Sequence, residues 1–280
     1  MKKKLAPVLL ALLFVVALAQ VLLYQPWSPK HNAVSEVIEK AENGDYFFMQ
    51  HSYPSGRIDY AAHRAASVAF MQARTNTMAL KPTGIPEWEF AGPVNIGGRL
   101  VDIEFDPGNQ QVAYLAAASG GVFKTKDGGS TWSPLFDNET TLSIGDIAVA
   151  PSDPDIIYVG TGEANGGSGS LTYDANGIYK STDAGLTWIN VGLETTRMTG
   201  RVVVHPTNPD IVFAATMGDL YGPTPDRGLY KTIDGGVTWT NVLFVNDSTG
   251  VIDVVINPQN PAIVFATTWM RTRHPNKKDY

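Results

Sequence analysis

The sequence contains no cysteine, so a disulfide framework, a thiolate metal site and a cysteine nucleophile are all excluded. Basic runs are also missing apart from the first five residues and the pair at 277–278, and the net charge is -6. An acidic chain without a basic stripe argues against a nucleic-acid partner. No metal-ligand spacing and no Gly-rich phosphate loop are present, so we expect neither a metal nor a cofactor.

Long apolar runs are missing beyond the first segment, which excludes a protein with several membrane spans. With 44% hydrophobic and 17% charged residues, the composition is that of a globular protein. The 27 glycines and 18 prolines among 280 residues indicate many turns.

Residues 1–24 have the pattern of an export segment. Lys2, Lys3 and Lys4 precede an apolar run from Leu5 to about Tyr24, and Ala17-Leu18-Ala19 fits the small-x-small pattern of signal peptidase sites. Cleavage after Ala19 would release the protein, whereas an uncleaved run of this length would anchor it in a membrane. Both alternatives predict an exported protein of the periplasm, cell surface or extracellular space.

Residues 25–87 do not share the pattern that follows them. Ser35–Glu42 and Tyr60–Ala73 have the periodicity of short amphipathic helices, and a Pro-Ser-Gly turn at 54–56 separates them. We interpret this region as a helical leader or extension of the main domain.

From about Trp88 the sequence repeats itself roughly every 50 residues, a period typical of propeller blades. Three eight-residue segments share the pattern S/T-x-D-x-G-x-T-W: Thr125–Trp132, Ser181–Trp188 and Thr232–Trp239. Each follows a short β-forming run, namely Gly121–Lys124, Gly177–Lys180 and Gly228–Lys231. A second set of turns, rich in Pro, Asp and Asn, keeps the same period: Asp106–Asn109, Pro151–Pro154, Pro206–Pro209 and Pro258–Pro261.

A β-branched run precedes each turn of this second set, and a β-rich run follows it. They are Leu100–Phe105, Ile144–Ala150, Arg201–His205 and Val251–Ile256 before the turns, and Val112–Leu115, Ile156–Val159, Ile211–Ala214 and Ile263–Ala266 after them. One unit is thus a four-stranded antiparallel meander. The predicted fold class is all-β: residues 88–280 form a partial β-propeller, with three complete blades and a truncated fourth, preceded by the signal or anchor helix and the helical leader.

The eight-residue segments are explained by turn chemistry. Their Asp side chains can accept backbone N–H bonds, their glycines can take a positive φ, and their tryptophans are expected to return into the core between blades. We therefore expect a structural role for Asp127, Gly129, Trp132, Asp183, Gly185, Trp188, Asp234, Gly236 and Trp239.

The pattern S/T-x-D-x-G-x-T-W resembles the Asp box, or BNR repeat, of sialidases, xyloglucan-active glycoside hydrolases, the sortilin/Vps10 propeller and a photosystem assembly factor. A tighter resemblance is to large secreted bacterial proteins of the sortilin-like or BNR-repeat glycosyl hydrolase type. It is carried by Gly92–Arg99, Ala118–Thr125, Gly160–Glu163 and Thr199–Pro206. Such relatives form larger rings, so the resemblance implies that this chain is an N-terminal fragment. The xyloglucan-active enzymes carry an acidic residue before the Gly-Gly-aromatic strand, where this chain has Ala118.

Successive loops of a blade alternate between the two faces of a propeller. The face opposite the repeated turns carries the longer loops with charged and aromatic side chains, where a ligand site is expected. Arg99 and Arg201 each follow a glycine before an innermost strand, so we expect them at matching positions that point toward the central channel. The ligand-binding candidates are Arg99, Glu163, Asn165, Tyr173, Asp174, Arg201, Asp219, Tyr221, Arg227, Trp269 and Arg271.

Three functions remain open. The first is a non-catalytic exported module that binds peptide, protein or carbohydrate, with membrane contact only through an uncleaved N-terminal segment. The second is a glycoside hydrolase of sialidase or xyloglucanase type, or a fragment of one, with Glu163 and Asp174 as a possible carboxylate pair. The third is a structural or assembly platform. No motif assigns catalytic residues.

Overall fold

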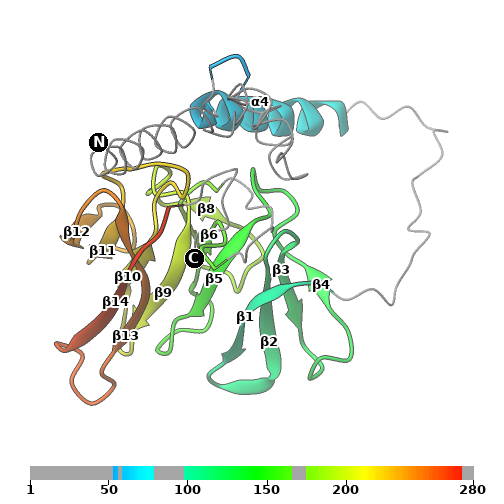
Figure 1. Ribbon diagram of the computed structural model, residues 1–280. Coiled ribbons are helices and arrows are strands. Elements are labelled where there is room, and N and C mark those ends of the chain that lie inside the picture. Colours follow the sequence, from blue (N-terminus) through cyan, green and yellow to red (C-terminus); the bar gives the residue numbers. More distant parts are fainter. Residues whose placement is uncertain (1–52, 56–58, 79–97, 166–174, 273–280) are drawn as a thin grey trace, which may run out of the picture. The chain divides into compact units, whose positions relative to one another are not determined.

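The structure is a computed structural model that describes residues 53–55, 59–78, 98–165 and 175–272 (Figure 1). All of them belong to one unit, Glu42–Tyr280. The predicted export segment and the helix expected at Ser35–Glu42 lie outside the described residues. Within them, no helix is both long and apolar enough to cross a membrane.

The helix expected at Tyr60–Ala73 is confirmed, and it extends further, as α4 (Tyr60–Met78). It begins where the Asp59 carboxylate accepts a hydrogen bond from the backbone N–H of Ala62 at 2.9 Å, an N-cap that satisfies one of the free donors of the first turn.

Residues 100–270 form the predicted antiparallel sheets (Figure 1). The first blade consists of β1 (Leu100–Asp106), β2 (Asn109–Ala117), β3 (Gly121–Thr125) and β4 (Ser133–Pro134). The second consists of β5 (Ile144–Val149), β6 (Ile157–Thr161), β7 (Ile178–Ser181) and β8 (Ile189–Asn190). The third consists of β9 (Thr199–His205), β10 (Asn208–Thr216), β11 (Gly228–Thr232) and β12 (Thr240–Leu243), and the fourth of β13 (Thr249–Ile256) and β14 (Val264–Met270). The fold prediction of a partial β-propeller is confirmed.

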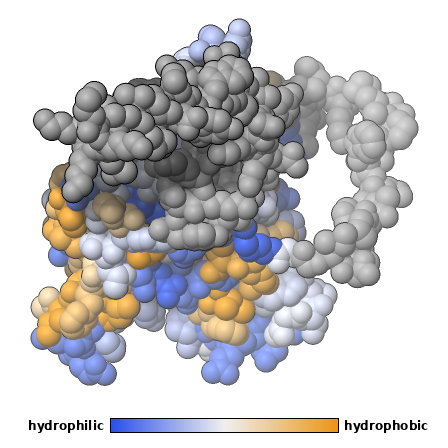
Figure 2. Space-filling view, viewed as in Figure 1, coloured by the Kyte–Doolittle hydropathy of each residue, from blue (hydrophilic) through white to orange (hydrophobic). Residues whose placement is uncertain are grey.

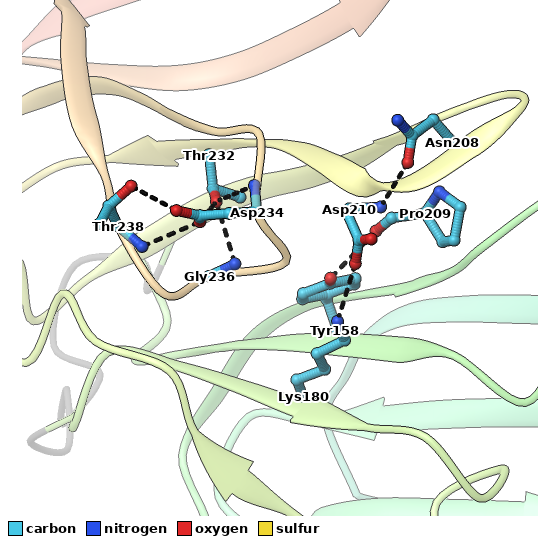
Figure 3. Close-up of polar contacts among 9 residues, drawn as sticks. All are labelled: Tyr158, Lys180, Asn208, Pro209, Asp210, Thr232, Asp234, Gly236 and Thr238. Atoms are coloured by element: carbon cyan, nitrogen blue, oxygen red, sulfur yellow. Dashed lines mark hydrogen bonds and ion pairs between the residues drawn. The ribbon is translucent and has the colours of Figure 1, made fainter.

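The three eight-residue turns share one hydrogen-bond pattern, drawn for the third in Figure 3. One Asp234 oxygen accepts the Thr232 hydroxyl at 2.7 Å and the Thr238 N–H at 2.9 Å, and the other accepts the Thr238 hydroxyl at 2.6 Å. Gly236, at a φ of 98°, donates its N–H to the Thr232 hydroxyl. Asp127 and Asp183 bind their turns in the same way. These bonds hold the pKa of each carboxyl at about 2, and they tie each Asp side chain to its own turn.

The tryptophans differ from one turn to the next. Trp188 packs into the core between the first two blades and donates its indole N–H to Leu135 of the preceding blade at 3.0 Å. Trp239 does the same one blade later, with Val191 as acceptor at 2.8 Å. The expectation is wrong for Trp132, which bonds its own turn at Gly129, because no blade precedes it among the described residues.

The repeated turns and the Pro/Asn turns lie on the same face, as predicted. Within each blade a backbone N–H of the repeated turn binds a carbonyl one or two residues after the Pro/Asn turn: Gly128 to Gln111, Ala184 to Asp155 and Gly235 to Asp210. Neighbouring blades also meet on this face, where the Tyr158 hydroxyl donates to the Pro209 carbonyl and Lys180 pairs with Asp210 (Figure 3). The repeated turns and the Pro/Asn turns are therefore held together by hydrogen bonds on this face.

Candidate functional site

The first strand of each blade carries a β-bulge near its start. One residue of each strand is skipped in the pairing: Val101, Gly145, Gly200 or Ile252. The next residue then occupies the same position in every blade, opposite the second strand. That position holds Asp102, Asp146, Arg201 and Asp253 in β1, β5, β9 and β13. Repeated bulges thus place three carboxylates and one guanidinium in equivalent positions.

Two of the bulge residues are glycine because neighbouring first strands touch there. A Cβ atom at Gly145 would lie 2.1 Å from the Thr199 carbonyl oxygen, and one at Gly200 would lie 2.2 Å from the Ile252 carbonyl oxygen. Both distances are far below van der Waals contact. The close approach of these backbones draws the equivalent side chains of successive blades together.

Arg201 lies among the three carboxylates. Its guanidinium is 3.1 Å from Asp146, 3.7 Å from Asp102 and 3.6 Å from Asp253. The second oxygen of Asp146 accepts the backbone N–H of Val202 at 2.7 Å. One cation therefore joins side chains from four blades.

Two carboxyl groups in this region are shifted toward the protonated form. Burial, with a further contribution from the charge of Asp102, raises the pKa of the Asp146 carboxyl to about 8. Burial and the same neighbour raise the pKa of Glu104 to about 7, although Arg201 acts in the opposite direction. Desolvation favours the neutral form of a carboxyl group, and here it outweighs the nearby guanidinium.

A second ion pair joins Arg99, just before β1, to Glu163, just after β6. Glu163 is buried, whereas Arg99 is partly exposed. Both ion-pair groups border one cleft of about 560 Å³. Its lining residues are Arg99, Leu100, Val101, Gly145, Asp146, Glu163, Asn165, Gly200, Arg201, Ile252, Asp253 and Thr267.

The cleft brings together four of the predicted site residues, Arg99, Glu163, Asn165 and Arg201. The expectation that Arg99 and Arg201 occupy matching positions is wrong. Arg99 precedes the bulge and accepts the N–H of Ala118 through its carbonyl, whereas Arg201 follows the bulge and lies opposite Ala215. The shared Gly-Arg sequence concealed a difference of register that only the strand pairing reveals.

The predicted residues of the third blade form a structural cluster outside the cleft lining. Arg227 is fully buried and donates to the carbonyls of Ser248, Arg271, Asp219 and Gly222. Asp219 accepts the N–H of Tyr221 at 2.8 Å. These bonds tie the loop after β10 to Ser248 and Arg271, so the buried Arg227 guanidinium is occupied by backbone carbonyls.

Trp269 and Arg271 belong to a second group outside the cleft lining. The Arg271 guanidinium stacks over the Trp269 ring at 4.4 Å and donates to the carbonyl of Ala164, which is buried beside Glu163. Tyr173 and Asp174 lie outside the described residues. Of the predicted carboxylate pair, only Glu163 can therefore be placed.

Sequence reasoning missed Asp102, Asp146 and Asp253. Each one lies directly after a bulge residue, so it aligns with Arg201 only once that residue is skipped in the strand pairing. The part of the chain that the structure describes holds no group of three or more His, Asp or Glu side chains arranged to bind a metal ion. The two arginines that line the cleft, Arg99 and Arg201, are both paired with acidic side chains of the chain itself.

No family model matches the chain, but several curated proteins are similar to it. A xyloglucanase of Acetivibrio thermocellus is 26% identical over 209 residues, which are 69% of this chain and 23% of the relative. An oligoxyloglucan-reducing end-specific xyloglucanase of Emericella nidulans is 27% identical over 211 residues, 68% of this chain and 24% of the relative. A Paenibacillus sp xyloglucanase is 27% identical over 171 residues, 56% of this chain and 16% of the relative.

Among solved structures, an ancestral GH74 enzyme is 25% identical with a TM-score of 0.51, over 62% of this chain and 22% of that one. The chain thus spans less than a quarter of the length of these relatives. The comparisons support the glycosyl hydrolase-like side of the predicted resemblance, and the sortilin-like side stays a prediction. The chain is a partial β-propeller that is similar to part of these xyloglucanases.

Proposed function

We infer that the cleft binds a carbohydrate and that this chain is part of a glycoside hydrolase-like propeller. The observation that supports this most directly is the cleft of about 560 Å³, which Asp146, Arg201 and Asp253 from three successive blades line together with Arg99 and Glu163. Carbohydrate hydroxyls donate to carboxylate oxygens, and polar groups converging on a concave surface are typical of a ligand site. The similarity to xyloglucanases makes a xyloglucan chain the first ligand to test.

The charges favour an uncharged glycan. Arg99 and Arg201 line the cleft, but each is paired with carboxylates of the protein itself. A ligand carboxylate would have to displace these pairs and would meet the remaining acids. A sialidase-like cluster of arginines that grips an acidic sugar does not fit this arrangement.

Hydrolysis is a second candidate, favoured by one observation. A pKa of about 8 keeps the Asp146 carboxyl protonated at neutral pH, as a general acid requires, and further carboxyl groups lie close by. Against it stands Ala118, a buried residue at the position where the xyloglucan-active enzymes carry an acid. Binding is accordingly the primary proposal for this chain, and hydrolysis the secondary one.

Titration calorimetry of the full chain with xyloglucan oligosaccharides tests the proposal. Asp253→Ala removes a half-exposed cleft carboxylate, and Asp210→Ala removes an equally exposed carboxylate that pairs with Lys180 on the turn face. We expect the first variant to weaken binding at least about tenfold and the second to leave it unchanged.

Equal loss in both variants, or no binding of any neutral polysaccharide, would refute a carbohydrate site in the cleft. Binding of peptides instead would support the sortilin-like alternative. Release of reducing ends from xyloglucan that disappears in Asp146→Asn would establish the secondary proposal.

A further inference from the structure

The position directly after the bulge links each first strand to the first strand of the next blade. Between the first two blades, the backbone N–H of Ile147 on β5 reaches the Asp102 carboxylate of β1 at 3.5 Å. Between the second and third blades, the N–H of Val202 on β9 donates to the Asp146 carboxylate of β5 at 2.7 Å. A carboxylate at this repeated position thus accepts an N–H of the following blade.

The junction between the third and fourth blades departs from this repeat. Its first strand, β9, carries Arg201 at the position, and a guanidinium cannot accept a hydrogen bond from a backbone N–H. The equivalent N–H, that of Val254 on β13, donates instead to the carboxylate of the preceding residue, Asp253, at 2.9 Å. A carboxylate at position 201 would have fitted the repeat. Departures from a local rule of this kind are expected at functional sites.

Arg201 serves instead as the counter-ion of three other blades. Its guanidinium lies 3.1 Å from Asp146, 3.7 Å from Asp102 and 3.6 Å from Asp253. Carboxylates arranged around one point are typical surroundings of a bound cation, and here the cation is a side chain of the protein itself. The Arg201 side chain is 40% exposed and lines the cleft, so its position is open to a ligand.

The charge of the cleft depends on this one side chain. Figure 2 shows hydrophilic residues between the hydrophobic areas over β1 and over β13 and β14. Without Arg201, the charged lining residues would be Asp146, Asp253 and the paired Arg99 and Glu163. Such a lining has an excess of carboxylates and would attract cations in preference to uncharged molecules.

We propose that Arg201 determines the specificity of the cleft by occupying the place of a cationic ligand. It reserves the cleft for uncharged ligands, excludes cations, and holds the carboxylates of Asp146 and Asp253 in fixed orientations. The identity of the uncharged ligand rests on the proposed carbohydrate-binding function. The exclusion of cations follows from the ion pairs alone, so it has a test of its own.

Titration calorimetry of the full chain with Ca²⁺, an ion that binds carboxylate oxygens, provides this test. We expect Arg201→Ala to bind Ca²⁺ at least about tenfold more tightly than the wild type, and the additional change Asp253→Ala to abolish the gain. Arg99→Ala is the matched control, because it removes the other cleft arginine, which pairs with Glu163, and should bring no gain. A pH of about 9 suits the titrations, since burial raises the pKa of Asp146 to about 8 and a cation binds the ionised carboxyl.

Circular dichroism of each variant verifies that the sheets remain folded. If Arg201→Ala loosens the blades, Arg201→Met retains most of the side-chain volume without the charge and gives the same test. Either variant, once folded, would overturn the proposal if it bound Ca²⁺ no more tightly than the wild type.

Xyloglucan oligosaccharides test the preference for an uncharged ligand. We expect Arg201→Ala to weaken their binding at least about tenfold, and Arg201→Lys, which keeps the positive charge, to weaken it less. Equal affinity of Arg201→Ala and the wild type for these sugars would overturn the role of Arg201 in specificity. A wild type that binds no xyloglucan would refute the carbohydrate site, and the Ca²⁺ titrations would still decide whether Arg201 excludes cations.

Discussion

The Asp146 carboxylate on β5 bridges to β9 through two groups, the guanidinium of Arg201 at 3.1 Å and the backbone N–H of Val202 at 2.7 Å. The contact joins two blades at the cleft, yet burial keeps the pKa of Asp146 at about 8. The protonation state of one side chain thus links the stability of the blade junction to pH.

Folding stability should fall as the pH rises toward 8. The folded chain holds a proton on Asp146 that the unfolded chain loses above its ordinary pKa of 3.8, so the free energy of unfolding decreases across this window. In Asp146→Asn this contribution is absent and the pH profile should be flatter. Urea unfolding at a series of pH values from about 4 to about 8 measures the difference. As the control, Asp137→Asn replaces an exposed side chain and should leave the slope of unfolding free energy against pH as in the wild type. A wild-type slope in Asp146→Asn would contradict a raised pKa of Asp146.

Gly200→Ala should destabilise the chain strongly. Its new methyl group would meet the Ile252 carbonyl oxygen at 2.2 Å and push β13 away from β9, at a cost of about 1–3 kcal/mol or more. Gly222→Ala is the matched control, since a Cβ atom there meets nothing within 4 Å. Chemical denaturation compares the two variants, and equal midpoints would show that the first strands are not in close contact.

Trp239→Phe should cost more stability than Trp132→Phe. The first substitution removes a hydrogen bond to Val191 of the preceding blade, worth about 0.5–1.5 kcal/mol, together with part of the packing between blades. The second removes only a bond within the turn, to Gly129. Thermal unfolding of both variants tests the ranking, and a larger loss for Trp132→Phe would contradict it.

Arg227→Ala should destabilise the loop that follows β10 rather than alter ligand binding. It leaves the carbonyls of Ser248, Arg271, Asp219 and Gly222 without their donor, at a cost of roughly 2 kcal/mol or more. Hydrogen exchange should accelerate around residues 217–227, and the exposed helix substitution Arg74→Ala should change nothing there. If Arg227→Ala weakened ligand binding but left hydrogen exchange in this loop unchanged, Arg227 would have a direct role in binding.

The blades could be predicted because their signals are local. Each turn contains the Asp, Gly and Thr side chains that form its own hydrogen bonds, so Thr232–Trp239 defines a hairpin without help from the rest of the chain. The export segment has an equally local signal, but it lies outside the described residues and stays a prediction.

The site could be predicted only in part, because long-range pairing decides it. Asp102, Asp146 and Asp253 align with Arg201 only after a bulge residue is skipped in each strand, and nothing in the sequence marks that slip. Arg227 looked like a ligand-binding residue because its acceptors are backbone carbonyls, which carry no sequence signal.

The indole bonds of Trp188 and Trp239 run in one direction, from each blade to the one before it in the chain. A polypeptide that leaves the ribosome from its N-terminus therefore presents each unit before the unit that will seal it. Each new blade packs against the one before it through this tryptophan, and its own opposite side stays exposed until the next blade is made. At these two junctions, the tryptophan that packs against a blade is therefore synthesised after that blade.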